Sequence, residues 1–180
     1  MTADYDVEVD WRAFEIHPET PPEGRRHPES VRARRAANFE NMKVRAQELG
    51  LEMVLLEMSP NSRRALEAAE HARGKGAHDP FHHAVFRRLF AEGLDVYRWE
   101  VLRAAAEEAG LDADEMQKKV EAGVYKAAVD AHTDEARSLG ITGVPTFLFE
   151  GGYAIVGAQP YRAFEEMMRH LGGQRRESAG

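Results

Sequence analysis

Residues 140–160 read GITGVPTFLFEGGYAIVGAQP. Two runs rich in β-branched and aromatic residues, Pro145–Phe149 and Tyr153–Val156, flank the pair Gly151-Gly152. Such a pair between two short apolar runs is typical of a tight turn, so the stretch predicts a β-hairpin. Pro160–Leu171 follows with its large apolar residues at helical spacing, which predicts a closing helix.

The start of the chain predicts one further strand. Within Asp6–Ile16, the apolar residues Val7, Val9 and Trp11 alternate with charged ones, a pattern typical of a strand with one buried face. The stretch His17–His27 contains three prolines and a glycine, so we expect it to form a loop.

Helical signals dominate the region between. A short apolar run at Leu51–Leu56 interrupts them, and it is too short to distinguish a strand from a buried helix. Asp79-Pro80 predicts a helix start, because aspartate can cap free backbone amides and proline suits the following position. We expect helices at Pro28–Leu49, from Ser59–Ser62 to about Gly74, from Asp79 onward, and at Trp99–Ala109, Asp112–Ala122 and Val124–Leu139.

The order of these elements predicts an α/β protein with a helical insertion. Residues 1–27 and 140–172 would form the core, and residues 28–139 the helical insertion domain. The polar residues 173–180 would form a flexible tail.

Composition excludes several functional classes. The 180 residues contain no cysteine, so this chain has no disulfide, thiolate metal site or thiol nucleophile. A net charge of −7 disfavours nucleic-acid binding. No apolar run is long enough to span a membrane, and the N-terminus lacks the pattern of a secretory signal. We therefore expect a cytoplasmic protein without a cofactor.

Four stretches together resemble the DsbA family of thioredoxin-fold proteins, and most closely its FrnE-like branch. They are VEVDWRAFEIHP at 7–18, NSRRALEAA at 61–69, FHHAVF at 81–86 and the hairpin stretch at 140–159. The resemblance implies an incomplete thioredoxin-like core (strand, β-hairpin, C-terminal helix) with a large helical insertion. It also implies a thiol–disulfide oxidoreductase, whose Cys-Pro-x-Cys pair follows a first strand at the start of a first helix. That segment is absent from this chain.

The absent strand would lie between Asp6–Ile16 and the hairpin, so the resemblance implies an open sheet. Three interpretations remain open. The gene product begins upstream of Met1; a second copy covers the gap and gives a homodimer; or Leu51–Leu56 supplies a substitute strand.

The resemblance implies a binding site around Pro145. The matching proline of the family is cis, and the backbone of the preceding residue, here Val144, pairs with an extended peptide or thiol-containing substrate. Thr146 flanks this turn, where its hydroxyl either contacts a ligand or is satisfied locally. Ala158 and Gln159 precede the closing helix, whose free amides could hold a carboxylate. Related kappa-class glutathione transferases and chromene-carboxylate isomerases bind glutathione at this corner with Ser-Asp, so Ala158-Gln159 argues against glutathione.

Other candidate residues have plainer interpretations. His78 and His82 stand one helical turn apart, but solvated histidines are more common than a metal site. We expect Trp11 and Trp99 to be core anchors. An apolar stripe at helical spacing predicts core, with one or two members open to substrate: Phe81, Val85, Phe86, Leu89 and Phe90.

The function expected from these observations is that of a DsbA/FrnE-like protein that is redox-inactive as written, because no residue can supply a thiolate. The alternatives are a non-catalytic peptide or small-molecule binding protein, and a glutathione-dependent isomerase or transferase.

Overall fold

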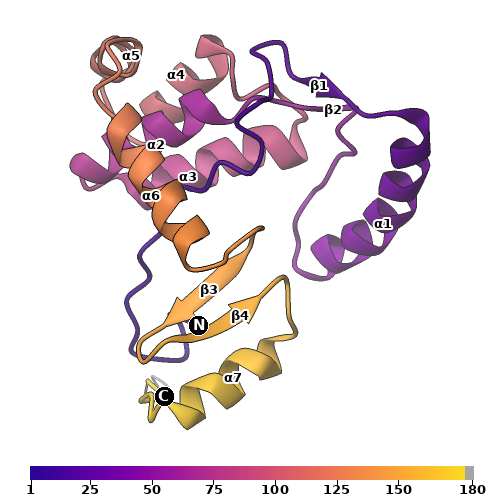
Figure 1. Cartoon of the computed structure of the whole chain (residues 1–180), viewed down its shortest axis with the longest axis vertical. Coiled ribbons are helices and arrows are strands. Elements are labelled where there is room, and N and C mark those ends of the chain that lie inside the picture. The colour runs from indigo at the N-terminus through magenta and orange to yellow at the C-terminus, as the bar shows by residue number, and fades with distance from the viewer. Residues whose placement is uncertain (177–180) are drawn as a thin grey trace.

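The computed structural model describes residues 1–176, and most of its buried core lies in a block of five helices (Figure 1). Fully buried alanines, among them Ala68, Ala72 and Ala105, let the helices approach closely, while Phe81 and Leu102 fill the space between them. The helices are α2 (Arg63–Gly74), α3 (His78–Phe86), α4 (Trp99–Glu108), α5 (Ala113–Glu121) and α6 (Lys126–Ser138). All five lie where the sequence predicts helices.

Helix α3 differs from the expectation at both ends. Asp79 lies inside the first turn, after Ala77, and its side chain caps no amide. At the other end, α3 continues into a π-helix, η1 (Arg87–Ala91). The predicted apolar stripe is divided between the core and the surface, and two of its members are exposed as expected. Phe81 and Val85 are buried, whereas Phe86 and Phe90 are 47% and 37% exposed.

The predicted hairpin forms as β3 (Thr146–Phe149) and β4 (Tyr153–Val156), which pair antiparallel. Its turn uses Gly151 and Gly152, both with positive φ. Helix α7 (Tyr161–His170) packs Phe164 edge-on against Phe147, with ring centroids 4.8 Å apart. The hairpin and α7 lie together below the helical block (Figure 1).

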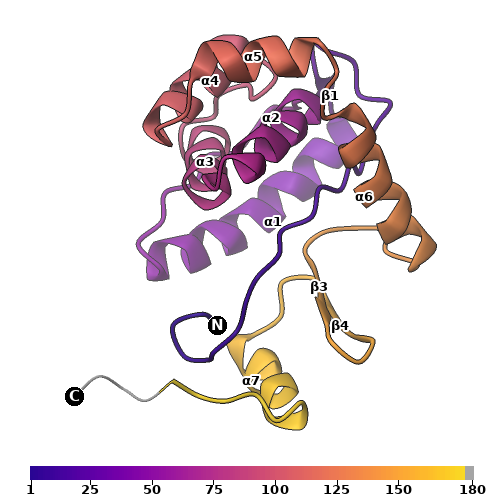
Figure 2. The same cartoon turned by 90° about the vertical axis from the view of Figure 1, so that its left-hand side faces the viewer.

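The prediction that Asp6–Ile16 forms a strand is wrong. The segment runs past the hairpin to the helical block without joining any ladder among residues 1–176 (Figure 2). A strand needs a hydrogen-bonding neighbour, and none lies beside it. Trp11, expected in the core, is 43% exposed, whereas Trp99 packs against the core. Leu51–Leu56 is not a substitute strand either.

The remaining strands are two residues long. β1 (Arg25–Arg26) pairs with β2 (Met58–Ser59), so residues 1–176 contain two separate two-stranded sheets. In the sequence between β1 and β2, helix α1 (Glu29–Glu48) stands apart from the helical block (Figure 1), and of its residues only Ala46 is buried.

The two ends of the described chain meet. Tyr5 forms a bridge with Arg175, and the amide of Asp6 donates to the carbonyl of Gln174 at 3.0 Å. The predicted flexible tail at 173–180 therefore begins with residues that contact the N-terminus, and residues 177–180 lie outside the described range. None of the helices within residues 1–176 is long and apolar enough to span a membrane.

Candidate functional site: the Pro145 loop and the edge of β3

The Pro145 loop connects α6 to β3. The Val144–Pro145 peptide bond is cis, the conformation that the resemblance implies. The hydroxyl of Thr146 donates to the carbonyl of Gly143 at 2.9 Å, so this hydroxyl is satisfied within the loop. Val144 and Pro145 are both exposed, and Val144 is 55% exposed. The loop thus presents an apolar residue and its backbone to solvent.

The hairpin brings the second predicted corner beside this loop. The amide of Gly157 donates to the carbonyl of Pro145 at 2.8 Å, which places Ala158 and Gln159 next to the proline. The side-chain amide of Gln159 donates to the carbonyl of Val156 at 3.0 Å, so it closes its own turn. The structure therefore brings the five predicted site residues together, although two of their polar side chains are already occupied.

One edge of β3 is open, as the resemblance implies for the hairpin side of the absent strand. In an antiparallel pair, only alternate residues point their backbone N–H and C=O groups toward the neighbouring strand. The hydrogen bond from Gly157 to Pro145 shows which residues these are, so the backbone groups of Phe147 and Phe149 point toward β4. The backbone N–H and C=O groups of Thr146 and Leu148 then point away from β4 and find no partner within residues 1–176. We call these groups the free edge of β3. The Leu148 side chain is 56% exposed.

The N-terminus of α7 lies beside the same corner. Its capping residue, Pro160, offers no side-chain hydrogen bond. The Tyr161 hydroxyl contacts the Asp4 carboxylate, and this hydrogen bond to a negative group raises the pKa of Tyr161 to about 12. Ala158 adds no polar side chain, so nothing at this corner replaces the Ser-Asp pair expected of a glutathione site.

A ladder of aromatic rings lines the exposed side of α3 and η1. His82 stacks on Phe86 with centroids 4.1 Å apart, Phe86 contacts Phe90, and Trp11 of the N-terminal segment lies against His82 at 4.6 Å. Burial, reinforced by the neighbouring His78 and His83, lowers the pKa of His82 to about 4. The ring is therefore neutral near pH 7 and acts as an aromatic surface rather than a charge.

The histidines do not form a metal site. His78 and His82 stack with centroids 5.6 Å apart, and in the part of the chain that the structure describes, no three His, Asp or Glu side chains gather to hold a metal ion. The spacing of two histidines one turn apart is therefore explained by ring stacking.

An ion cluster around Arg63 holds the N-terminal segment on the helical block. Its guanidinium donates to Glu67 at 2.6 Å, to Asp130 at 2.7 Å and to Glu15 at 3.0 Å. Burial alone would lower the pKa of Arg63, but these hydrogen bonds outweigh burial and raise it. Sequence reasoning did not predict this cluster, because Glu15 and Asp130 lie 48 and 67 positions from Arg63 along the chain.

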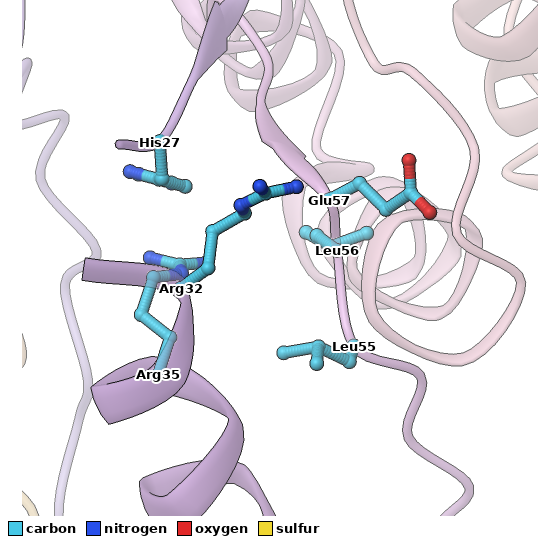
Figure 3. A pocket seen from close by; sticks show the side chains of 6 residues that line it. All are labelled: His27, Arg32, Arg35, Leu55, Leu56 and Glu57. Atoms are coloured by element: carbon cyan, nitrogen blue, oxygen red, sulfur yellow. The ribbon is translucent and has the colours of Figure 1, made fainter. Parts of the chain in front are cut away.

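A small pocket lies away from the Pro145 loop, between α1 and the segment that contains Leu51–Leu56 (Figure 3). Its volume of about 210 Å³ is below the range of typical ligand pockets. Basic side chains and two leucines form most of its wall; the lining residues are His27, Arg32, Arg35, Leu55, Leu56 and Glu57. Arg32 already contacts Glu29, so the pocket has no built anion site.

The Pro145 loop has features that suit the recognition of an extended ligand. It offers exposed apolar side chains and backbone groups that are unpaired within residues 1–176. A strand-like ligand can use all of these features without a nucleophile.

Comparison with known proteins gives a consistent result. A family model described as DSBA-like thioredoxin domain matches residues 1–169. The protein YwbO of Bacillus subtilis (strain 168), described as uncharacterized, is 28% identical over 167 residues, which cover 89% of this chain and 80% of YwbO.

Two solved structures share the fold. The crystal structure of a probable DsbA oxidoreductase from Streptomyces coelicolor aligns with a TM-score of 0.76 and 26% identity, covering 94% of this chain and 77% of that one. A 2-hydroxychromene-2-carboxylate isomerase aligns with a TM-score of 0.70 over 91% of this chain and 80% of the isomerase. At 20% identity the second similarity is one of fold alone.

Proposed function

The chain belongs to the DSBA-like thioredoxin domain family, and we propose that it binds extended polypeptides at the Pro145 loop without thiol–disulfide turnover of its own. Its fold is thioredoxin-like with a large helical part, as in the DsbA-type structure that it resembles. Assignment to the FrnE-like branch is part of this proposal and rests on the four stretches at 7–18, 61–69, 81–86 and 140–159, of which the last is the most specific.

The observation that carries the proposal is the state of Val144. No hydrogen bond joins its N–H or C=O to another group within residues 1–176, and its side chain is 55% exposed. An extended peptide can satisfy both groups by pairing with this one residue, as in strand addition. The neighbouring loop is fixed by the Gly157-to-Pro145 hydrogen bond, so the pairing groups are held in place before a ligand arrives.

Redox turnover is excluded from the proposal on chemical grounds. Thiol–disulfide exchange begins with attack by a thiolate, and these 180 residues contain no cysteine. We expect the purified chain to reduce insulin no faster than the buffer does. Turnover above that background would contradict this part of the proposal.

A glutathione-dependent reaction is the weaker candidate. Ala158 offers no side-chain donor, and the Gln159 amide is used by Val156. The isomerase similarity supports only the shared fold.

The binding proposal can be tested with a labelled ten-residue apolar peptide and fluorescence polarisation. A set of peptides, each methylated at one backbone nitrogen, removes one donor at a time. We expect one methylated position to weaken binding about fivefold, since a net hydrogen bond contributes about 1 kcal/mol. Methylation of the peptide nitrogen on either side of this position should have little effect, because alternate amides of an extended peptide point away from the loop.

Two protein variants control this measurement. Val144→Ala keeps the backbone groups, so the position dependence should persist while overall affinity falls slightly. Val124→Ala changes an equally exposed valine in the helical block, 57% exposed, and should bind like the unaltered chain. Equal sensitivity at every methylated position, or no binding at all, would refute pairing at Val144.

A further inference from the structure

The chain exposes more surface than a folded monomer of its mass. Its accessible surface is 11797 Å² for 20.2 kDa, whereas a compact monomer of that mass exposes about 8,800 Å². The difference is an excess of about 3,000 Å². This is nearly four times the surface that each partner contributes to a protein–protein interface of standard size, about 800 Å².

Part of this surface is an unprotected strand edge. The free edge of β3 presents the backbone of Thr146 and Leu148, and none of the four residues Thr146–Phe149 is charged. Natural proteins usually block such an edge with lysine, proline or a bulge. An edge that lacks these features is suited to pairing with another strand.

The same chain carries a segment suited to be that strand. From Glu8 to Phe14, no backbone group forms a hydrogen bond within residues 1–176. Val9 is 49% exposed and Trp11 is 43% exposed. Side chains hold the segment in place: Asp10 accepts from Arg73 at 2.6 Å.

We propose that the chain forms a two-fold homodimer in which the free edge of β3 of each copy pairs with Glu8–Phe14 of the other. A two-fold interface requires that each copy offer both members of a contact, and this chain has a donor segment and an acceptor edge that are not paired with each other. The dimer would complete the open sheet reciprocally.

The amount of surface favours a second copy over a short peptide as the occupant. An excess of about 3,000 Å² per chain corresponds to about 6,000 Å² for the pair, which matches the largest interfaces of obligate homodimers. A peptide strand alone would leave most of that surface exposed, including helix α1, of which only Ala46 is buried among the described residues. Val144 adjoins the free edge of β3, so the second copy and an extended peptide would compete there, but formation of the dimer does not require peptide binding.

Light scattering coupled to size-exclusion chromatography of the whole chain tests the proposal. We expect a mass of twice 20.2 kDa across a range of concentrations. Leu148→Lys places a charge on the free edge and should give the monomer mass with an unchanged far-UV spectrum. Leu139→Lys is the matched control, because Leu139 is 60% exposed after α6 and away from the edge, and it should remain dimeric.

Engineered disulfides test the pairing itself, because the chain has no cysteine of its own. Mixed and oxidised copies that carry Val9→Cys or Leu148→Cys should give more linked dimer than either variant alone. A monomer mass at every concentration would overturn the proposal, and so would a larger open assembly. A dimer that persists in Leu148→Lys and forms no mixed disulfide would overturn it as well. Peptide binding is measured separately, so either proposal can fail without the other.

Discussion

Replacing Arg63 with Met removes the cation that three carboxylates share. Arg63 is 21% exposed, while the side chains of Glu15 and Glu67 are each only 10% exposed. The third carboxylate, Asp130, also binds Lys126 at 2.7 Å and therefore keeps a partner. The variant thus leaves two poorly solvated carboxylates without a nearby cation.

The magnitude follows from that burial. Removing one partner of a buried ion pair costs about 3–5 kcal/mol, because the remaining charge is left uncompensated. We expect the lower end of the range, about 3 kcal/mol, since one of the three carboxylates keeps its lysine. The total free energy of unfolding of a domain is about 5–15 kcal/mol, so the loss is large and measurable.

Urea unfolding followed by circular dichroism measures this loss. Arg162→Met is the matched control, because Arg162 pairs with Glu166 on the surface and is 84% exposed; that change should cost at most about 0.5 kcal/mol. Adding Glu15→Gln and Glu67→Gln to Arg63→Met should restore part of the stability, since it removes the uncompensated charges. A loss below about 1 kcal/mol in Arg63→Met, or no recovery in the triple variant, would refute the reasoning.

Two further changes test the aromatic contacts. The pKa of His82 is about 4 in the folded chain against 6.5 for the free group, so the folded state binds fewer protons between these values and stability falls as pH drops from 7 to 4. The full shift corresponds to about 3.4 kcal/mol, which partial exposure of the ring reduces to about 1–2 kcal/mol. Urea unfolding at pH 7 and pH 4 should show this loss of stability in the unaltered chain and in His83→Phe, and a smaller loss in His82→Phe. Equal losses in all three proteins would contradict the prediction. Phe164→Ala removes the ring that packs on Phe147 and should lower the free energy of unfolding by about 3 kcal/mol. The loss should appear as reduced amide-exchange protection in β3 and β4. Val156→Ala is the control, because Val156 is 65% exposed, and it should leave this protection unchanged.

Local signals in the sequence were sufficient for the elements that satisfy their own hydrogen bonds. The hairpin contains both strands and its turn within eleven residues, so Gly151-Gly152 and the flanking apolar runs were enough to place it. Helix α5 begins after Asp112, whose carboxylate accepts from the amides of Asp114 and Glu115, as a capping residue should. In both cases the partners are close along the chain.

Sequence reasoning failed where the partner is distant or lies outside the described chain. Asp6–Ile16 has the alternation of a strand, but alternation describes side chains and supplies no hydrogen-bonding neighbour. The π-helical turn η1 was likewise not predicted, because it depends on packing rather than on a local pattern. The Arg63 cluster joins residues up to 67 positions apart, which no local pattern reveals.

At the candidate site, the register of the hairpin did not follow from the sequence, because a two-residue turn at Gly151-Gly152 would pair Thr146 with Gly157. The structure pairs Thr146 with Val156 instead, and this places Pro145 opposite Gly157. Ala158 and Gln159 must then lie beside the proline whatever family the chain resembles. The same register assigns Leu148 to the open edge.

The failed strand prediction and the open edge of β3 have the same cause, which is that neither segment has a hydrogen-bonding neighbour on one side among residues 1–176. The segment Asp6–Ile16 is anchored at its far end, where the amide of Glu15 donates to the Thr133 hydroxyl at 3.2 Å. It is anchored near its start by the bridge between Tyr5 and Arg175. Between these anchors the backbone is extended and unpaired, so a strand added there would need little further ordering of the chain. The alternation of Val7, Val9 and Trp11 is therefore the pattern of a strand that has no neighbour among residues 1–176, and the proposed dimer would supply one.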